Sequence, residues 1–282
     1  MPATASNGRA SHGLSGRARI AYKFSLFILL LIIASCLRPF LPVFRLFGIP
    51  SWLPAAIWFR VYLPAIGVRV VEHGKLARRP VLLAANHVSW LDIASLGTRI
   101  GGGFVSKAEV AKWPLLGWFA TGTGTVYLTR GAHRSRAAND TLLARFRDDY
   151  SIAIFPEGTT TACRLPKLFH GRLFGAAIEG GTLVQPVAIH YPPPPGMALD
   201  QHPVAPFIDQ IDFMEHMLAV LASPGLTVEI TYCKPIDPKD LNRRQLADLS
   251  RQRICEALGT PDHPAERAIP PGRERRARAR TG

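Results

Sequence analysis

From residue 67 onward, short runs of apolar and β-branched residues alternate with longer segments of helical pattern, which limits the fold more than any other feature. Such alternation is typical of an α/β fold with helices packed on a mainly parallel sheet. The predicted strands are residues 68–72, 81–85, 104–107, 125–128, 151–155, 183–189 and 227–233. The predicted helices are residues 90–98, 108–120, 133–149, 171–179, 210–222 and 238–258. We therefore expect one α/β domain with a central sheet of about seven strands.

Turn-forming residues mark some of the boundaries. The last predicted helix can begin with Asp237 as its cap and Pro238 in its first turn, and Gly259 suits its end. Residues 191–206 contain four consecutive prolines, a glycine and two further prolines, so they are predicted to form a loop.

An apolar region, residues 18–66, precedes the alternating pattern. Residues 24–37 carry no charge, and residues 46–59 carry two tryptophans and two interrupting prolines. A full helical span needs about 20 apolar residues, whereas interfacial tryptophans and flanking arginines suit the headgroup layer. We predict a helical membrane anchor, formed by two interfacial helices or by one short span and one interfacial helix.

Two other interpretations of this region remain open. A signal peptide has the same order of charged and apolar residues, and residues 33–36 resemble a lipoprotein cleavage site. A buried core helix is the second alternative. The four cysteines, Cys36, Cys163, Cys233 and Cys255, are widely spaced without a CxxC pair, which fits a reducing compartment better than export.

The chain is strongly basic, with a formal net charge of +14 and a pI near 10.3. Such a surplus favours polyanionic partners such as anionic lipid surfaces. Arginines crowd residues 273–280, and we predict that residues 1–17 and the basic tail, residues 260–282, are disordered. No recognised nucleic-acid-binding module accompanies these arginines, so nucleic acid is not an expected partner.

The segment Asn86–Asp92 contains a histidine, His87, with a carboxylate, Asp92, five positions later. One such pair is weak evidence in a chain with nine histidines, but its position is informative. His87 follows a predicted strand and precedes a predicted helix, where active sites of parallel α/β sheets gather. Five residues on an α-helix turn through about 500°, so His87 must lie before the helix for the carboxylate of Asp92 to reach it.

This pair suits general base catalysis. A neutral His87 can take the proton of an acceptor hydroxyl while that oxygen attacks a thioester carbonyl, and Asp92 can fix the tautomer and stabilise the imidazolium. The attacking hydroxyl belongs to the substrate, and the chain contains no G-x-S-x-G nucleophile motif. The alternative is a helix-capping histidine beside a solvated aspartate.

Further candidate residues end other predicted strands. Phe155-Pro156-Glu157-Gly158-Thr159 is a strand running into a turn, where Glu157 can accept hydrogen bonds from acceptor hydroxyls and Gly158 permits close approach of the backbone. Arg130 and Lys107 each close a strand and can bind an anionic headgroup. The alternatives are a strand-ending turn with an exposed Glu157, and solvent-exposed side chains for Arg130 and Lys107 without a binding role.

Together, these blocks resemble the lysophospholipid acyltransferase family in order and spacing, over about residues 68–232. Asn86-His87…Asp92, Gly124…Arg130, Phe155-Pro156-Glu157-Gly158-Thr159 and Val184-Gln185-Pro186-Val187 resemble its four blocks. The resemblance implies His87 as general base with Asp92 as partner. It implies acceptor binding by Arg130, Glu157 and Gly158, to which we add Thr159 and Lys107. It further implies an acyl-CoA or acyl-carrier-protein donor, an amino-terminal membrane motif, and no metal or organic cofactor.

One departure from the family pattern concerns the acceptor. Many phosphate-binding members carry an arginine directly after the threonine of the third block and a Phe-Lys-Lys/Arg-Gly segment further on. Here Thr160-Thr161 follows Thr159, and residues 168–171 read Leu-Phe-His-Gly. Lysophosphatidic acid and lyso-ornithine lipid therefore both remain open as acceptors, and acyl chain length and oligomeric state are not predicted.

The resulting hypothesis is a membrane-bound O-acyltransferase for lyso-lipids. Its catalytic domain is residues 67–259, anchored at the cytoplasmic face of the inner membrane, with lyso-lipid, acyl donor and membrane lipids as partners. The alternative is a non-catalytic, lipid-binding relative of the same fold.

Overall fold

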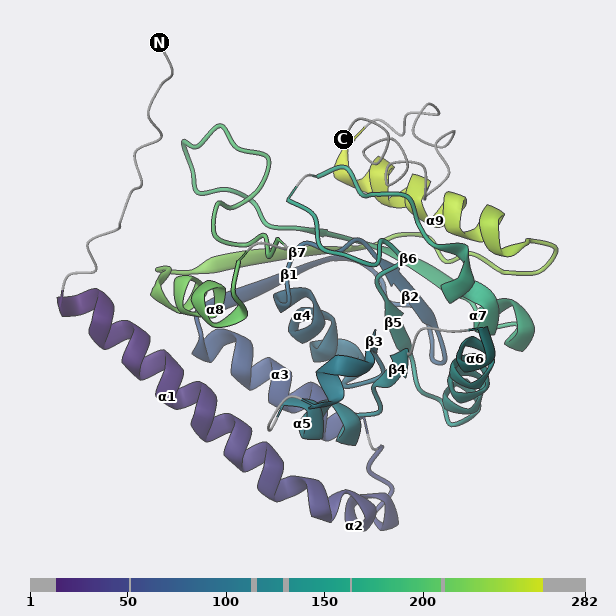
Figure 1. The fold of residues 1–282 in the computed structure, drawn as a ribbon, viewed down its shortest axis with the longest axis horizontal. Helices are drawn as coiled ribbons and strands as arrows, with labels where there is room; N and C mark the ends of the chain where they lie inside the picture. The colour runs from purple at the N-terminus through teal and green to yellow at the C-terminus, as the bar shows by residue number, and fades with distance from the viewer. Residues whose placement is uncertain are drawn as a thin grey trace, which may run out of the picture.

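The computed structural model describes residues 14–50, 52–112, 116–128, 132–162, 164–208 and 211–260. A five-stranded sheet in the order β1-β7-β6-β2-β5 forms its centre (Figure 1). β6 and β7 pair antiparallel, and the other neighbouring pairs are parallel. The strands are β1 Val68–Gly74, β2 Leu82–Ala85, β5 Ile152–Ile154, β6 Val184–His190 and β7 Leu226–Tyr232.

The remaining predicted strands form a separate two-stranded piece beside β5. β3 (Val105–Lys107) pairs in parallel with β4 (Val126–Leu128). A parallel bridge between Phe104 and Ala153 joins this piece to β5. All seven predicted strands therefore exist, but the continuous sheet holds five of them, and the other two form the separate β3-β4 piece.

Helices cover both faces of the sheet (Figure 1). Helices α1, α3, α4 and α8 pack on one face and α6, α7 and α9 on the other. Alternate residues of β2 divide between these two layers: Leu83 and Ala85 join the first, and Leu82 and Ala84 the second. The bounds are α1 Leu14–Leu37, α2 Leu41–Leu46, α3 Leu53–Ala65, α4 Leu91–Ile100, α5 Leu116–Gly122, α6 Ala132–Arg147, α7 Gly175–Gly180, α8 Phe213–Ala222 and α9 Arg243–Leu258.

Several predicted helix boundaries need correction. The predicted helix 108–120 consists of a 3-10 turn, Ala108–Lys112, followed by α5, and the predicted helix 171–179 begins with a 3-10 turn, Gly171–Phe174. Helix α9 starts at Arg243 rather than at residue 238. Asn242 and Gln245 form a reciprocal capping box there, while Asp240 has a left-handed φ of 62° that interrupts a helix.

The amino-terminal helices pack against the domain. Trp58 of α3 donates its indole N–H to the carbonyl of Leu30 in α1 (2.8 Å), and buried Lys23 donates to the carbonyl of Ser223 after α8 (3.0 Å). In the described part of the chain, one helix, residues 16–37, is long enough and apolar enough to cross a membrane, by length and composition alone. Within it, 17% of an 18-residue apolar stretch is buried inside the structure. Helix α1 begins at Leu14, inside the segment 1–17 for which the sequence predicts disorder, and residues 261–282 of the predicted tail lie outside the described residues.

Candidate active site

Three adjacent parallel strands deliver the candidate residues to one edge of the sheet. β2 lies between β6 and β5, and His87 follows β2 directly after Asn86. Glu157 follows β5, and Tyr191 follows β6. The carboxyl ends of parallel strands are where open α/β sheets place their ligand sites. Chain segments far apart in sequence therefore meet around His87.

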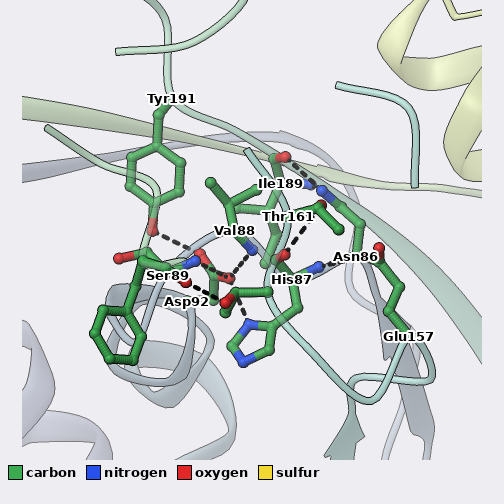
Figure 2. A network of polar contacts seen from close by, with 11 residues as sticks. Asn86, His87, Val88, Ser89, Asp92, Glu157, Thr161, Ile189 and Tyr191 are labelled. Atoms are coloured by element: carbon green, nitrogen blue, oxygen red, sulfur yellow. Dashed lines mark hydrogen bonds and ion pairs between the residues drawn. The ribbon is translucent and has the colours of Figure 1, made fainter. Parts of the chain in front are cut away.

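His87 and Asp92 form the centre of this arrangement (Figure 2). The His87 Nδ1 and Asp92 Oδ2 atoms lie 2.8 Å apart. His87 lies in the loop between β2 and α4, and Asp92 lies in the first turn of α4, where a carboxylate is favoured by the helix dipole. The Asp92 side chain is fully buried, whereas that of His87 is 17% exposed. A substrate can thus approach the imidazole but not the carboxylate.

The hydrogen bonds of Asp92 define the tautomer of His87. Asp92 Oδ2 also accepts from the backbone N–H groups of Val88 (2.7 Å) and Ser89 (2.9 Å), and its Oδ1 accepts from the Tyr191 hydroxyl (2.6 Å). A carboxylate surrounded by donors is an ionised acceptor, so Nδ1 of His87 must carry the hydrogen. The lone pair of Nε2 is then available to accept a proton from a substrate.

The ring and main chain of His87 are held by other groups. The Phe155 ring stacks on the imidazole, with centroids 4.0 Å apart and planes 18° apart. Glu157 Oε1 accepts from the backbone N–H of His87 (2.8 Å), and the backbone N–H of Thr161 donates to the His87 carbonyl (2.8 Å). The segment after β5 therefore fixes the position of the loop that carries His87.

Glu157 is buried, and both its carboxylate oxygens are used. Its Oε2 accepts from the backbone N–H of Lys167 (2.8 Å), opposite the bond to His87. Burial raises the pKa of Glu157 to about 7, against the opposing effect of these two amide donors. The fully buried Arg251 of α9 donates to the carbonyls of Pro166 (3.0 Å) and Lys167 (3.2 Å), which anchors this loop to the rest of the domain.

The other predicted site residues are placed less centrally. Gly158 has a left-handed φ of 72°, so its turn favours glycine, and Thr159 lies half-buried beside it. Lys107 ends β3, but its side chain is outside what the structure describes, and Arg130 lies wholly outside the described residues. The acceptor-binding roles of Arg130, Lys107, Glu157, Gly158 and Thr159 remain predictions.

Sequence reasoning missed three residues of this network. Tyr191 is separated from Asp92 by 99 residues and carries no motif signal beyond its position after a predicted strand. Phe155 belongs to the third block, but its ring stacks on His87 because β5 lies beside β2, and the sequence does not indicate that order of strands. The buried Asn86 side chain donates to the carbonyl of Ile189 (2.9 Å) and accepts from its N–H (2.7 Å), joining the ends of β2 and β6. An asparagine at the end of an apolar run is the one sequence signal for such a bridge.

Within the described residues, no group of three or more histidine, cysteine, aspartate or glutamate side chains is arranged to hold a metal ion. The expectation of an enzyme without metal or organic cofactor stays a prediction.

Comparisons with known proteins indicate the family of this chain. A family model described as acyltransferase matches residues 67–190, which include His87, Asp92 and Glu157. The chain is 40% identical over 203 residues to a lyso-ornithine lipid O-acyltransferase of Pseudomonas aeruginosa, covering 71% of this chain and 76% of that protein. It is 36% identical over 220 residues to a protein of the same name from Rhizobium meliloti, covering 73% and 75%.

Two further similarities are more limited. A 1-acyl-sn-glycerol-3-phosphate acyltransferase of Neisseria gonorrhoeae is 35% identical over 127 residues, which are 45% of this chain and 50% of that protein. The crystal structure of the 1-acyl-sn-glycerophosphate acyltransferase PlsC from Thermotoga maritima superposes with a TM-score of 0.57 at 21% identity, covering 86% of this chain and 96% of that one. At this identity the superposition demonstrates a common fold.

Proposed function

The chain belongs to the acyltransferase family, and from this premise we propose that it transfers a fatty acyl chain from a thioester to the free hydroxyl of a lyso-lipid. The observation that carries this proposal is the 2.8 Å contact between His87 Nδ1 and the buried carboxylate of Asp92. It leaves the Nε2 atom of the partly exposed imidazole to act as the base. Acyl-CoA or acyl carrier protein is the proposed donor, and residues 67–259 are the proposed catalytic domain.

The proposed reaction needs one base. His87 Nε2 takes the proton of the lyso-lipid hydroxyl as the oxygen attacks the thioester carbonyl. Asp92 stabilises the resulting imidazolium through its Nδ1–H bond. The tetrahedral intermediate then expels the thiolate, and His87 returns the proton to the sulfur. The products are a diacylated lipid and a free thiol, and the histidine is again neutral.

We propose lyso-ornithine lipid as the acceptor. In sequence, relatives named for this lipid match over 75–79% of their length, whereas those named for 1-acyl-sn-glycerol-3-phosphate match over 48–50%. The residues that replace the family's basic positions also support this choice. Thr160 donates through its hydroxyl to the Phe207 carbonyl, and Thr161 donates to that of His87. These side chains bind the protein's own main chain, and neither supplies a cation for a phosphate monoester.

We propose that the protein associates with the cytoplasmic face of the membrane through its amino-terminal helices. Bulky apolar side chains are exposed along these helices, including Leu29, Ile32, Ile33 and Leu37 of α1 and Ile57 and Val61 of α3. The bonds from Lys23 and Trp58 tie α1 lengthwise to the domain, which favours a helix lying in the interface over one that spans. Depth-dependent quenching of a fluorophore placed at position 33 tests this choice, since deep burial at the bilayer centre would contradict an interfacial helix.

The acceptor is tested by incubating the purified protein in detergent or vesicles with acyl-CoA or acyl carrier protein and a panel of lyso-lipids. Products are identified by mass, and released thiol is measured in parallel. We expect acylation of lyso-ornithine lipid with a kcat/KM well above that for lysophosphatidic acid. A preference for lysophosphatidic acid would refute the proposed headgroup. Absence of thioester consumption with every lyso-lipid would favour a non-catalytic lipid-binding protein.

A further inference from the structure

The carboxylate of Asp92 has a second side-chain partner on the opposite side from His87. The Tyr191 hydroxyl donates to Asp92 Oδ1 over 2.6 Å, and both residues are fully buried. Figure 2 shows the phenol and the imidazole reaching the same carboxylate from two directions. The two partners use different oxygens, because His87 contacts Oδ2. His87, Asp92 and Tyr191 therefore form a continuous chain of hydrogen bonds from the partly exposed imidazole into the core.

Tyr191 is held firmly in this position. It follows β6 directly, and the preceding Ile189 is fixed to Asn86 through both its backbone groups. The carbonyl of Tyr191 accepts from the His202 N–H (2.7 Å), and its own N–H donates to the Gln201 side chain (3.3 Å). The main chain of Tyr191 is thus anchored through both its N–H and its carbonyl at the start of the proline-rich segment. The contact between Tyr191 and Asp92 therefore follows from the positions of β6 and β2 in the sheet.

The phenol acts as a donor at every physiological pH. Burial, followed by the negative charge of Asp92, raises the pKa of Tyr191 well above its ordinary value. An ionised carboxylate has no hydrogen to give, so the Tyr191 hydroxyl can only donate in this pair. A hydrogen bond to a charged group contributes more than one between neutral groups.

We propose that Tyr191 is a positioning residue for the acyl transfer proposed above. It keeps the Asp92 carboxylate in the plane that directs Oδ2 to His87 Nδ1. It also draws charge from the carboxylate, which limits how strongly Asp92 holds the protonated imidazole. Without the hydroxyl, Asp92 would lose its fixed orientation, and its more concentrated charge would favour the imidazolium. Transfer would then become slower, and the imidazole would lose its proton only at higher pH.

The test compares Tyr191→Phe with Tyr232→Phe, using kcat, KM and the pH–rate profile of acyl transfer. Tyr232 is a matched control, because it is also buried and donates to a carboxylate, Glu72 (2.9 Å), away from His87. We expect Tyr191→Phe to lower kcat by about 5- to 30-fold with little change in KM, and to move the acid limb of the profile to higher pH. Tyr232→Phe should change neither kcat nor the pH of the acid limb.

Other charged groups around His87 must be constant in this comparison. In the described part of the chain, the carboxylates that bond to His87 are Asp92 from α4 and Glu157 from the segment after β5, whose pKa is raised by burial to about 7. Both are present in the wild type and in the two variants, so the difference between profiles reports the hydroxyl. If Tyr191→Phe does not fold, 3-fluorotyrosine at position 191 gives a stronger donor, and the acid limb should then move to lower pH.

The outcomes separate this inference from the proposed function. If the wild type transfers no acyl chain to any lyso-lipid, the proposed function fails first. If the wild type is active and Tyr191→Phe keeps the kcat and the acid limb of Tyr232→Phe, the positioning role is wrong. A fall in thermal stability and kcat with an unmoved acid limb would also overturn it, because it would assign Tyr191 to packing alone.

Discussion

Replacement of Asp92 by asparagine removes one negative charge while keeping most of the geometry of the site. The carboxamide oxygen can occupy the Oδ2 position and still accept from His87 Nδ1 and from the N–H groups of Val88 and Ser89. The amide nitrogen then faces the Tyr191 hydroxyl, which can rotate to accept instead of donate. We therefore expect Asp92→Asn to fold.

The loss of activity follows from the missing charge. The nitrogen–oxygen distance of 2.8 Å places the centres of the imidazolium and carboxylate charges at a separation of about 4 Å. Two unit charges at that distance attract each other by about 4 kcal/mol at an effective dielectric constant near 20. The imidazolium forms only as the hydroxyl attacks, so this attraction mainly stabilises the transition state. We expect kcat to fall by about 1,000-fold and KM for either substrate to change little.

The assay is the initial rate of thiol release from the acyl donor at saturating lyso-lipid, with the lipid product identified by mass. Asp212→Asn is the matched control, because Asp212, like Asp92, accepts from two backbone N–H groups, but it lies at the start of α8. Asparagine and aspartate are equally good caps, so this control should keep wild-type activity and stability. A loss of less than about tenfold in kcat for folded Asp92→Asn would refute the electrostatic role of the carboxylate.

Three further predictions concern the residues that shape the site. The pKa of Glu157, raised to about 7, means that the folded protein binds this proton more tightly than the unfolded chain. Its contribution to the free energy of unfolding should fall by about 3 kcal/mol as the pH rises from about 4.5 to 7. Urea unfolding of Glu157→Gln should lack that slope, and equal slopes for both proteins would contradict it. Gly158→Ala places a side chain at a left-handed φ of 72°, which strains the backbone and should lower the free energy of unfolding by about 1–2 kcal/mol. An unchanged midpoint of urea unfolding would contradict this backbone strain. Asn86→Ala leaves the N–H and the carbonyl of Ile189 without their buried partner, which should lower the free energy of unfolding by about 1–3 kcal/mol for each group. A melting temperature equal to that of the wild type would contradict a stabilising role for the Asn86 bridge.

The sequence predicts the parts of the site that depend on local order. An apolar strand, a polar turn and a helix start are consecutive, so the approach of Asp92 to His87 follows from the spacing. All seven strands could be predicted for the same reason, since apolar or β-branched residues recur within short segments along the chain. The start of α9 was predicted at the wrong residue because two capping signals compete, and only the backbone of Asp240 decides between them.

The remaining parts depend on the order of strands in space. Tyr191 reaches Asp92 because β6 is the neighbour of β2, which no local pattern indicates. Glu157 resembles a substrate-binding carboxylate in the sequence, but both its oxygens accept from backbone amides in the structure. Its partner Lys167 belongs to a loop that Arg251 anchors from α9, and such a contact cannot be inferred without the packing of that helix.

The most direct test of imidazole-assisted attack is the single-turnover rate of product formation by His87→Ala beside the wild type. Both proteins are loaded with acyl donor, mixed with lyso-ornithine lipid and quenched for mass analysis of lipid and intact protein. We expect the variant to be slower by about 100- to 10,000-fold, and the wild type to form product with no acyl group on the protein. A rate for His87→Ala within about tenfold of the wild type, or a protein-bound acyl group that is passed on to the lipid, would contradict direct attack by the lipid hydroxyl.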